Sequence, residues 1–189
     1  MTGGNIRQRN GKMIALKRIE KDSEYKEELE RINTEAIPEC ERNSLDDLMD
    51  TGAEVQGIFL DNAPVGYFVL RKYKMILYLA YFAVRRERRS EGIGSRALKK
   101  LAEEKKDHLI VVEFEAPPGS ETNHMAERRR AFYLRNGFYE TGWFTFYDET
   151  EFEIACTSTS FDINAFNEFT EYLSTLVSDH IPHAYRKDG

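Results

Sequence analysis

The stretch that decides the fold reads Phe82-Ala83-Val84-Arg85-Arg86-Glu87-Arg88-Arg89-Ser90-Glu91-Gly92-Ile93-Gly94-Ser95. Its apolar start ends at Val84, a basic loop with two glycines follows, and apolar residues then recur at helical spacing from Ile93 to Leu101. Successive backbone N–H groups in such a loop, together with the positive end of the following helix, attract an anion without any one side chain. The stretch therefore predicts a phosphate-binding loop between a strand and a helix.

The segments around this loop predict a single α+β domain. Strands are expected where short apolar runs are bounded by turn residues, and helices where capping residues precede apolar residues at helical spacing. The strand, helix, strand order of residues 75–114 predicts a right-handed crossover between parallel strands. We expect a mixed, mostly antiparallel central sheet of about seven strands flanked by helices. The expected strands are 13–19, 55–60, 65–73, 75–84, 109–114, 139–146 and 151–157, and the expected helices run from Asp22 or Ser23 to Thr34, from Ser44 to Gly52, from Gly92 to Lys106, from Met125 to Arg135, and onward from Asp162.

Length and composition exclude several classes of protein. The 189 residues are 41% hydrophobic and 32% charged, which is typical of one soluble globular domain. No apolar run approaches the roughly 20 residues of a membrane helix, and no secretory signal is evident, so we expect a cytoplasmic protein without a membrane partner. Residues 1–12 are polar and are expected to form a flexible leader. Cys40 and Cys156 stand far apart and indicate reduced thiols, and the pair His180 and His183 has no third ligand near it, so no metal is expected.

Charge is unevenly distributed along the chain. Residues 85–106 carry nine basic and four acidic side chains, a balance of +5, although the whole chain has a net charge of −6. Residues 20–54 carry thirteen acidic and four basic side chains, a balance of −9. A positive island in an acidic protein suits a compact anionic ligand better than a nucleic acid, which an acidic surface would repel. Both segments are also consistent with solvated helix faces.

Two other kinds of phosphate-binding loop fit the stretch less well. A Walker A loop ends in Gly-Lys-Ser or Gly-Lys-Thr, whereas Gly94 is followed by Ser-Arg. The run Gly92-Ile93-Gly94-Ser95-Arg96-Ala97 does fit the dinucleotide fingerprint, and Glu113 lies about 20 residues further on, where a ribose-binding acid belongs. However, seven polar residues separate the strand from the first glycine, and the other strands do not alternate with helices. A nicotinamide-binding protein is therefore the less favoured alternative.

Two motifs resemble those of the GNAT superfamily of N-acetyltransferases. The acetyl-CoA motif of that family is an Arg or Gln, two residues, Gly, one residue, and Gly or Ala after the fourth strand, and Arg89-Ser90-Glu91-Gly92-Ile93-Gly94 is similar to it. The second signature, an aromatic-Tyr pair followed by Gly-Phe, resembles Phe132-Tyr133-Leu134-Arg135-Asn136-Gly137-Phe138. The resemblance extends from Met13 to about Thr157. It implies a GNAT domain at 13–160, followed by a C-terminal helix and tail at 161–189.

The loop departs from the family pattern at three positions. Arg86 stands where proline is common, Ser90 replaces a frequent glycine, and Glu91 is acidic where a basic residue is usual. Since the family's loop binds mainly through backbone N–H groups, these changes bear on affinity more than on identity. A carboxylate beside a pyrophosphate should weaken CoA binding unless it points to solvent or pairs with a neighbouring arginine.

The resemblance implies a site for acetyl-CoA as cosubstrate. In the family the fourth and fifth strands part after the position of Val84, and the pantetheine arm hydrogen-bonds to the freed backbone as an added strand. The N–H of Val84 is a candidate oxyanion donor. Arg85, Arg86 and the triplet 128–130 are available to screen the phosphates. The residues predicted to bind the cofactor are Phe82, Ala83, Val84, Arg89, Ser90, Glu91, Gly92, Ile93, Gly94 and Ser95.

Tyr133 and Glu113 are the predicted catalytic residues. By the resemblance, Tyr133 is the general acid that gives its proton to the departing thiolate, and simple packing with Phe132 is the alternative. Glu113 and Glu115 end an apolar strand on one face, and a carboxylate on that strand is the base in some relatives. We favour Glu113, directly or through water, while Glu115 or bulk water remains open. Among the aromatic residues, Tyr78 and Tyr81 are expected to line the site or the core, and Trp143, Phe144, Phe146 and Tyr147 to pack in a hairpin.

The resemblance implies an N-acetyltransferase that moves an acetyl group from acetyl-CoA to a primary amine by direct attack in a ternary complex. In relatives the first two helices and the last hairpin wall the acceptor site. Here those helices carry the segment of charge −9, so a small cationic amine or a peptide amine is expected as the partner. The alternative function is a CoA-binding sensor or scaffold without catalysis. A homodimer would then form through the apolar stripe Phe166, Phe169, Leu173 and Leu176 of the last helix.

Overall fold

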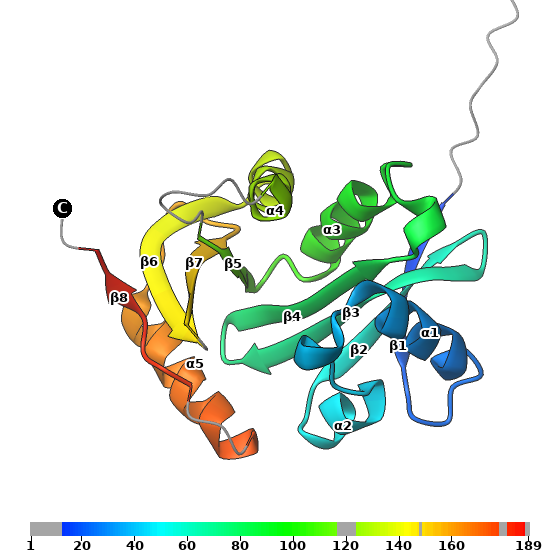
Figure 1. Cartoon of the computed structure of the whole chain (residues 1–189), viewed down its shortest axis with the longest axis horizontal. Coiled ribbons are helices and arrows are strands. Elements are labelled where there is room, and N and C mark those ends of the chain that lie inside the picture. The colour runs from blue at the N-terminus through cyan, green and yellow to red at the C-terminus, as the bar shows by residue number, and fades with distance from the viewer. Residues whose placement is uncertain (1–12, 117–123, 148, 178–180, 188–189) are drawn as a thin grey trace, which may run out of the picture.

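The computed structural model describes residues 13–116, 124–147, 149–177 and 181–187. Within these residues, eight strands form one sheet in the order β1-β2-β3-β4-β5-β7-β6-β8, and helices cover both of its faces (Figure 1). All neighbouring strands are antiparallel except β4 and β5, which are parallel and joined through α3. The predicted α+β fold with a mixed, mostly antiparallel sheet is confirmed, with one strand more than expected. The leader predicted at 1–12 lies outside the described residues.

The first half of the sheet is a four-stranded antiparallel meander. Its β2 and β3 are joined by Asp61 and Asn62, whose φ angles of 51° and 66° are those of a two-residue hairpin turn. Ser44 caps α2 as predicted, because its Oγ accepts a hydrogen bond from the N–H of Asp47 at 3.0 Å. The elements are β1 (Ile14–Ile19), α1 (Lys26–Ala36), the 3₁₀ helix η1 (Glu39–Glu41), α2 (Leu45–Asp50), β2 (Glu54–Leu60), β3 (Ala63–Tyr73) and β4 (Ile76–Val84).

The first helix begins later than the sequence predicts. Tyr25 occupies the N-cap position of α1, and no side chain caps it. The predicted cap at Asp22 or Ser23 is therefore wrong. Backbone hydrogen bonds from Ser23 to Glu20 and from Lys26 to Ser23 hold these residues in turns that lead from the edge strand to the helix.

The second half of the chain adds the parallel crossover, a hairpin, a long helix and a short last strand. Asp162 caps α5 as predicted, since its carboxylate accepts from the N–H groups of Asn164 and Ala165. The last strand, β8, was not predicted because only two residues pair with β6. The elements are η2 (Arg86–Arg88), α3 (Ile93–Glu104), β5 (Leu109–Glu115), α4 (His124–Arg135), β6 (Tyr139–Tyr147), β7 (Thr150–Cys156), α5 (Ile163–Leu176) and β8 (Tyr185–Arg186).

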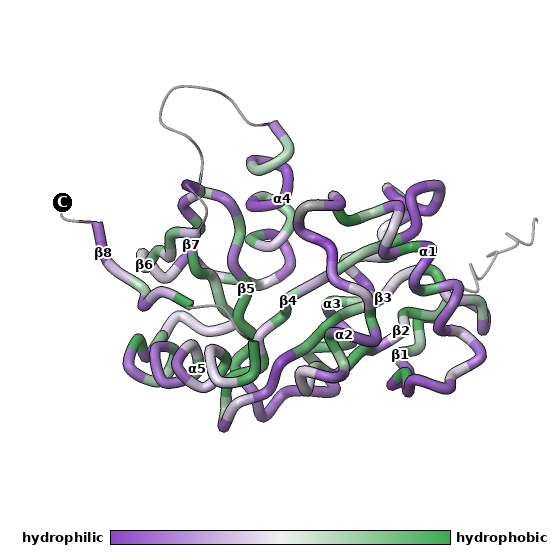
Figure 2. Tube along the Cα trace, turned by 60° about the horizontal axis from the view of Figure 1, so that its bottom comes forward, coloured by the Kyte–Doolittle hydropathy of each residue, from purple (hydrophilic) through white to green (hydrophobic). Residues whose placement is uncertain are grey.

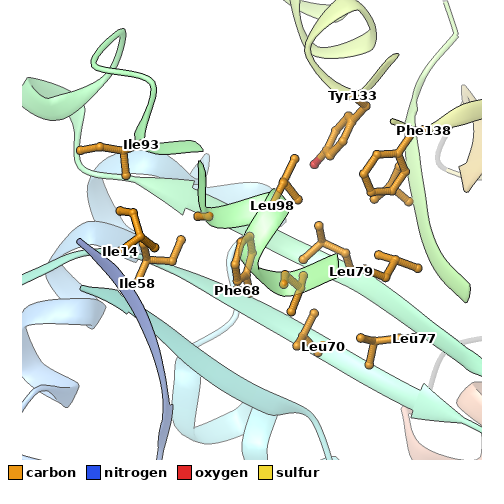
Figure 3. Close-up of a cluster of buried hydrophobic side chains, with 14 of the residues drawn as sticks. Ile14, Ile58, Phe68, Leu70, Leu77, Leu79, Ile93, Leu98, Tyr133 and Phe138 are labelled. Atoms are coloured by element: carbon orange, nitrogen blue, oxygen red, sulfur yellow. The ribbon is translucent and has the colours of Figure 1, made fainter. Parts of the chain in front are cut away.

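Each face of the sheet has its own hydrophobic core. Helices α3 and α4 cover one face, where Leu98 lies near Phe68 and Tyr133 lies beside Phe138 (Figure 3). Helices α1 and α2 cover the first half of the opposite face, and α5 covers its second half. Figure 2 shows the hydrophobic segments along the central strands and a largely hydrophilic α1. This arrangement follows from strand alternation, which sends successive side chains to opposite faces.

The apolar stripe of α5 belongs to this core. Phe166 and Phe169 are 0% and 1% exposed, and the ring of Phe169 lies 5.3 Å from that of Tyr78 on β4. Their neighbours include Val111 and Ile154 on β5 and β7. The expected dimer through this stripe is therefore wrong, because the same chain already covers it.

Strands β4 and β5 pair only over their first three residues. Cross-strand partners are found from Ile76 to Tyr78 on β4 and from Leu109 to Val111 on β5, and beyond them the two strands separate. The separation thus begins six residues before Val84, and not after it as predicted. Six residues of β4 border the resulting gap, which gives a bound group a longer stretch of strand to follow.

A bulge and a glycine shape the end of β4 beside this gap. Val69 pairs with Tyr81 and Leu70 pairs with Leu79, so Ala80 has no direct partner on β3. Further along, a Cβ on Gly66 would lie 2.3 Å from the carbonyl oxygen of Ala83. Only glycine allows β3 and β4 to approach this closely, and the approach fixes the end of β4.

Candidate active site

The predicted phosphate loop lies between the end of β4 and the first turn of α3. Ser90 and Gly92 both have left-handed backbone conformations, with φ angles of 69° and 74°. Helix α3 begins at Ile93, and no side chain caps its N-terminus. The N–H groups of its first turn have no carbonyl partners within the helix. The loop therefore has the backbone geometry of an anion site.

Glu91 forms an ion pair inside the loop. The guanidinium of Arg88 donates to its two carboxylate oxygens at 2.7 and 2.8 Å. This pairing neutralises the acidic side chain that departs from the family pattern. The objection that Glu91 raises against a phosphate ligand is thereby largely removed.

The end of β4 presents backbone groups to the gap beside β5. The N–H of Arg85 donates to the carbonyl of Val65 at 2.8 Å, which makes these residues a hydrogen-bonded pair. Such pairs alternate with non-hydrogen-bonded ones along antiparallel strands. The peptide groups of Phe82 and Val84 consequently point away from β3, while those of Ala83 point toward it. The geometry thus supports backbone binding by Phe82 and Val84, but not by the backbone of Ala83.

A cavity of about 550 Å³ lies against the loop and α4. A Cβ on Gly94 would lie 3.2 Å from the ring of Phe132 and 3.3 Å from that of Phe82, so this glycine lets the start of α3 pack closely there. Of the predicted cofactor residues, all but Glu91 line the cavity. Helix α4 adds Met125, Arg128, Arg129, Phe132 and Arg135.

The predicted screening arginines divide into two groups. Arg128 and Arg129 line the cavity, whereas Arg130 donates to Glu140 on β6. Arg85 pairs with Glu28 on α1. The positive charge available to a phosphate therefore comes from α4 and from Arg89.

A second cavity, of about 520 Å³, adjoins the first. The two share five lining residues, among them Phe82, Arg89 and Arg129. Its other walls come from segments far apart in the sequence: the link after α1, the middle of β4, β5, the hairpin, α5 and the tail. Both predicted catalytic residues, Glu113 and Tyr133, line it.

Glu113 is the centre of a hydrogen-bond network. The hydroxyl of Tyr78 donates to its Oε2 at 2.6 Å, and the hydroxyl of Thr145 donates to its Oε1. Burial raises the pKa of Glu113, while hydrogen bonds from Thr145, Tyr78 and Tyr147 act in the opposite direction. A carboxylate held in this way is fixed in position and is a stronger base than a solvated one.

Tyr133 lies between the aromatic core and the second cavity. It is 8% exposed, and its ring stacks 6.0 Å from Phe114. Its hydroxyl points away from α4 (Figure 3). Burial raises the pKa of Tyr133 to about 12, and the charge of Arg129 lowers it. The side chain is therefore protonated at neutral pH, as a proton donor must be.

Several contributors to this site were missed or misjudged from the sequence. Tyr147 was expected only to pack in its hairpin, yet it lines the second cavity and interacts with Glu113. The strand pattern places Thr145 and Tyr147 on one face, but it does not tell which residue of another strand they meet. Nothing local indicated the wall from α5, which consists of Phe166, Phe169, Thr170 and Leu173.

The acidic segment 20–54 does not form the expected rim. Glu41 is the one acidic residue that this segment contributes to the described lining of the second cavity. Asp46 pairs with Lys26 at 2.8 Å, and Glu54 pairs with Lys105 at 3.2 Å. These acids are largely neutralised by nearby lysines.

The described part of the chain shows neither a cluster of metal ligands nor a helix that spans a membrane. It holds no group of three or more His, Cys, Asp or Glu that could bind a metal ion. No helix there is long and apolar enough to cross a membrane. Cys156 is a buried free thiol, while His180 and the side chain of Cys40 lie outside the described residues.

Comparison with known proteins agrees with the geometry. Residues 53–140 match the family model of the acetyltransferase (GNAT) domain. A structure from Bacteroides thetaiotaomicron assigned to the GNAT family has a TM-score of 0.69 and 24% identity, covering 85% of this chain and 96% of its own. A GNAT acetyltransferase from Elizabethkingia anophelis with acetyl-CoA bound has a TM-score of 0.56 and 16% identity, covering 77% and 97%. The ribosomal-protein-S18-alanine N-acetyltransferase of Escherichia coli has a TM-score of 0.60 and 14% identity, covering 79% and 96%. A search of curated proteins gave no match to this chain.

The likenesses to solved structures establish a shared fold. The chain therefore has the fold of the GNAT acetyltransferases, and its residues 53–140 match the model of their domain. The nicotinamide alternative is excluded by the same fold, because the sheet is not doubly wound.

Proposed function

We propose that the protein transfers an acetyl group from acetyl-CoA to a primary amine, by direct attack in a ternary complex. One observation carries the proposal: the cavity behind the phosphate loop opens into a second cavity that holds a buried carboxylate, Glu113, and a protonated phenol, Tyr133. A donor and an acceptor bound in adjoining cavities would meet at the residues that the two share. The bound acetyl-CoA in the Elizabethkingia structure supports the choice of donor.

The residues present fit acetyl-CoA on the chain's own geometry. The loop and the start of α3 offer backbone N–H groups to a pyrophosphate. The gap between β4 and β5 exposes the peptide groups of Phe82 and Val84 to a pantetheine arm. The guanidinium of Arg89, which donates to the carbonyl of Val84 at 3.1 Å, stands where the two cavities join.

The chain's own residues then divide the proton transfers between them. When bound, acetyl-CoA supplies the thioester whose carbon–sulfur bond breaks as the new carbon–nitrogen bond forms. Glu113 accepts the proton that the amine must lose, and Tyr133 donates a proton to the departing sulfur. The N–H of Val84 faces the gap and stabilises negative charge on the carbonyl oxygen. The products are an amide and free CoA.

The direct test is binding followed by turnover. Acetyl-CoA should raise the melting temperature of the protein, since a ligand that binds only the folded state stabilises it. A thiol-release assay over a panel of primary amines should then detect free CoA. Stabilisation by NAD but not by acetyl-CoA would overturn the proposal.

The alternative, a CoA-binding sensor without catalysis, is separated by Tyr133→Phe. An enzyme should lose about 10²-fold or more in kcat while retaining its affinity for CoA. A sensor has no rate to lose, and would show the same stabilisation by CoA in both forms. A cytoplasmic location and the absence of nucleic-acid and membrane partners stay predictions.

A further inference from the structure

We infer that the acceptor is a primary monoamine carried on an apolar body, aromatic or branched aliphatic, and not a polyamine or a peptide. The inference rests on the proposed function and narrows it. It is carried by the walls of the second cavity, by its charges, and by the hydrogen bonds that tie two of its lining segments together.

The walls away from the cofactor are aromatic and aliphatic. Leu173 on α5 and Tyr78 and Phe152 on the sheet contribute to these walls. The ring of Phe169 lies 5.3 Å from Tyr78 and 5.8 Å from Phe166. Phe166 and Phe169 are 0% and 1% exposed, so they present almost no surface themselves but hold the side chains of the wall in place. Such a surface favours an apolar ligand and leaves polar groups without partners.

The acidic side chains that line the second cavity can pair with only one ammonium group in its apolar part. Glu113 is the carboxylate near Tyr78, whereas Glu41 is exposed and belongs to the link after α1. Arg89 and Arg129 line the side shared with the cofactor cavity. The further ammonium groups of a polyamine would meet aromatic rings or guanidinium groups, and burying an unpaired charge is costly.

Hydrogen bonds tie together two segments that line the cavity. The hydroxyl of Tyr81 on β4 donates to the carbonyl of Glu41 at 2.7 Å, and it accepts from the side-chain amide of Asn43 at 3.2 Å. These bonds hold the segment after α1 against the strand. A cavity whose walls are tied together in this way suits a compact amine better than a lysine side chain attached to a polypeptide, whose backbone would need its own polar partners.

The experiment compares amines of matched reactivity. The full chain with saturating acetyl-CoA is assayed by thiol release with phenethylamine, 3-methylbutylamine, spermidine and a lysine-containing peptide. We expect kcat/KM for the two apolar amines to exceed that for spermidine and the peptide by about tenfold or more, the range that one well-placed group discriminates. Equal or better turnover of spermidine or the peptide would overturn the inference and leave the proposed function standing. No release with any amine would overturn both.

A pair of variants tests whether α5 sets the selectivity. Leu173→Ala enlarges the cavity, and should raise the ratio of kcat/KM for tryptamine to that for phenethylamine severalfold. Leu176→Ala on the same helix is the matched control, because Leu176 does not line the cavity, and it should leave the ratio unchanged. Acetyl-CoA should stabilise both variants as it does the parent. Should Leu173→Ala fail to fold, Ile181→Ala removes a half-buried lining residue outside the helices and should change the ratio in the same direction. An unchanged ratio in a folded lining variant would contradict the inference.

Discussion

The cavity against the phosphate loop, which we propose holds acetyl-CoA, adjoins the second cavity, which we propose holds the amine. We call them the cofactor cavity and the acceptor cavity, and they are built in different ways. The first is made mainly by the backbone of one continuous stretch, residues 82–95, with arginines added from α4. The second is made by side chains from the link after α1, β4, β5, the hairpin, α5 and the tail. A site made of backbone N–H groups tolerates changes of side chain, as Ser90 and Glu91 illustrate. A site made of side chains depends on each of them.

The largest expected effect is a loss of catalysis when the acceptor cavity loses its proposed base, while the affinity for acetyl-CoA is kept. Glu113→Gln should lower kcat by about 10²- to 10⁴-fold, because the amide cannot accept a proton. The affinity for acetyl-CoA should not change, since Glu113 does not line the cofactor cavity. Steady-state kinetics and thermal shift with acetyl-CoA measure the two quantities.

The matched control for this change is Glu115→Gln. Glu115 lies on the same strand and face but outside the described lining of both cavities. It should keep kcat within a few-fold of the parent. An equal loss in both variants would show that Glu113 is not the base.

The next effect comes from displacing the backbone at the end of β4, beside the cofactor cavity. Gly66→Ala places a Cβ 2.3 Å from the carbonyl oxygen of Ala83, so the end of β4 must move at a cost of about 1–3 kcal/mol. The Kd for acetyl-CoA should rise about tenfold, and calorimetric titration measures it. Gly52→Ala is the control, because Gly52 also needs glycine, with a φ of 78°, but has open space around it. It should lower the melting temperature and leave the Kd unchanged.

A smaller effect tests how the hydrogen bonds to Glu113 set its pKa. The hydrogen bond from Tyr78 lowers the pKa of Glu113, so Tyr78→Phe should raise it. Because the base must be ionised, activity rises with pH through this pKa. The rising limb of kcat/KM should therefore move to higher pH, with the plateau above it little altered. A limb that stays in place, or moves to lower pH, would contradict the assignment.

The smallest effect concerns the ion pair in the phosphate loop. Glu91→Gln releases Arg88, and acetyl-CoA should bind about two- to fivefold more tightly, as expected for loss of an exposed pair. Glu104→Gln makes the same charge change at the far end of α3, where Glu104 pairs with Lys100, and should have no effect. The difference between the two should shrink as salt is added.

The contrast between a site built from one continuous stretch and a site built from distant segments also explains what could be predicted from the sequence. The loop motif, the crossover around it and the cap of α2 at Ser44 were predictable because each depends on residues close together in the chain. The point where β4 and β5 separate was not, since it depends on pairing between strands that α3 holds apart. The role of Thr145 on β6 depends on two registers, that of β6 with β7 and that of β7 with β5, and register is a tertiary property. Glu113 was found through strand alternation and the family resemblance, while its partners came only from the structure.

Helix α5 and the tail contribute to the acceptor cavity and to none of the described lining of the cofactor cavity. Lining residues in this segment can therefore change without disturbing the cavity proposed for the donor. The helix as a whole cannot be exchanged, because Phe166 and Phe169 belong to the core of the sheet. For protein engineering, this makes Leu173 and Ile181 the positions at which new acceptors can be sought on an unchanged cofactor platform. It also argues for placing any purification tag at the N-terminus, because the last described strand, β8, is built into the sheet.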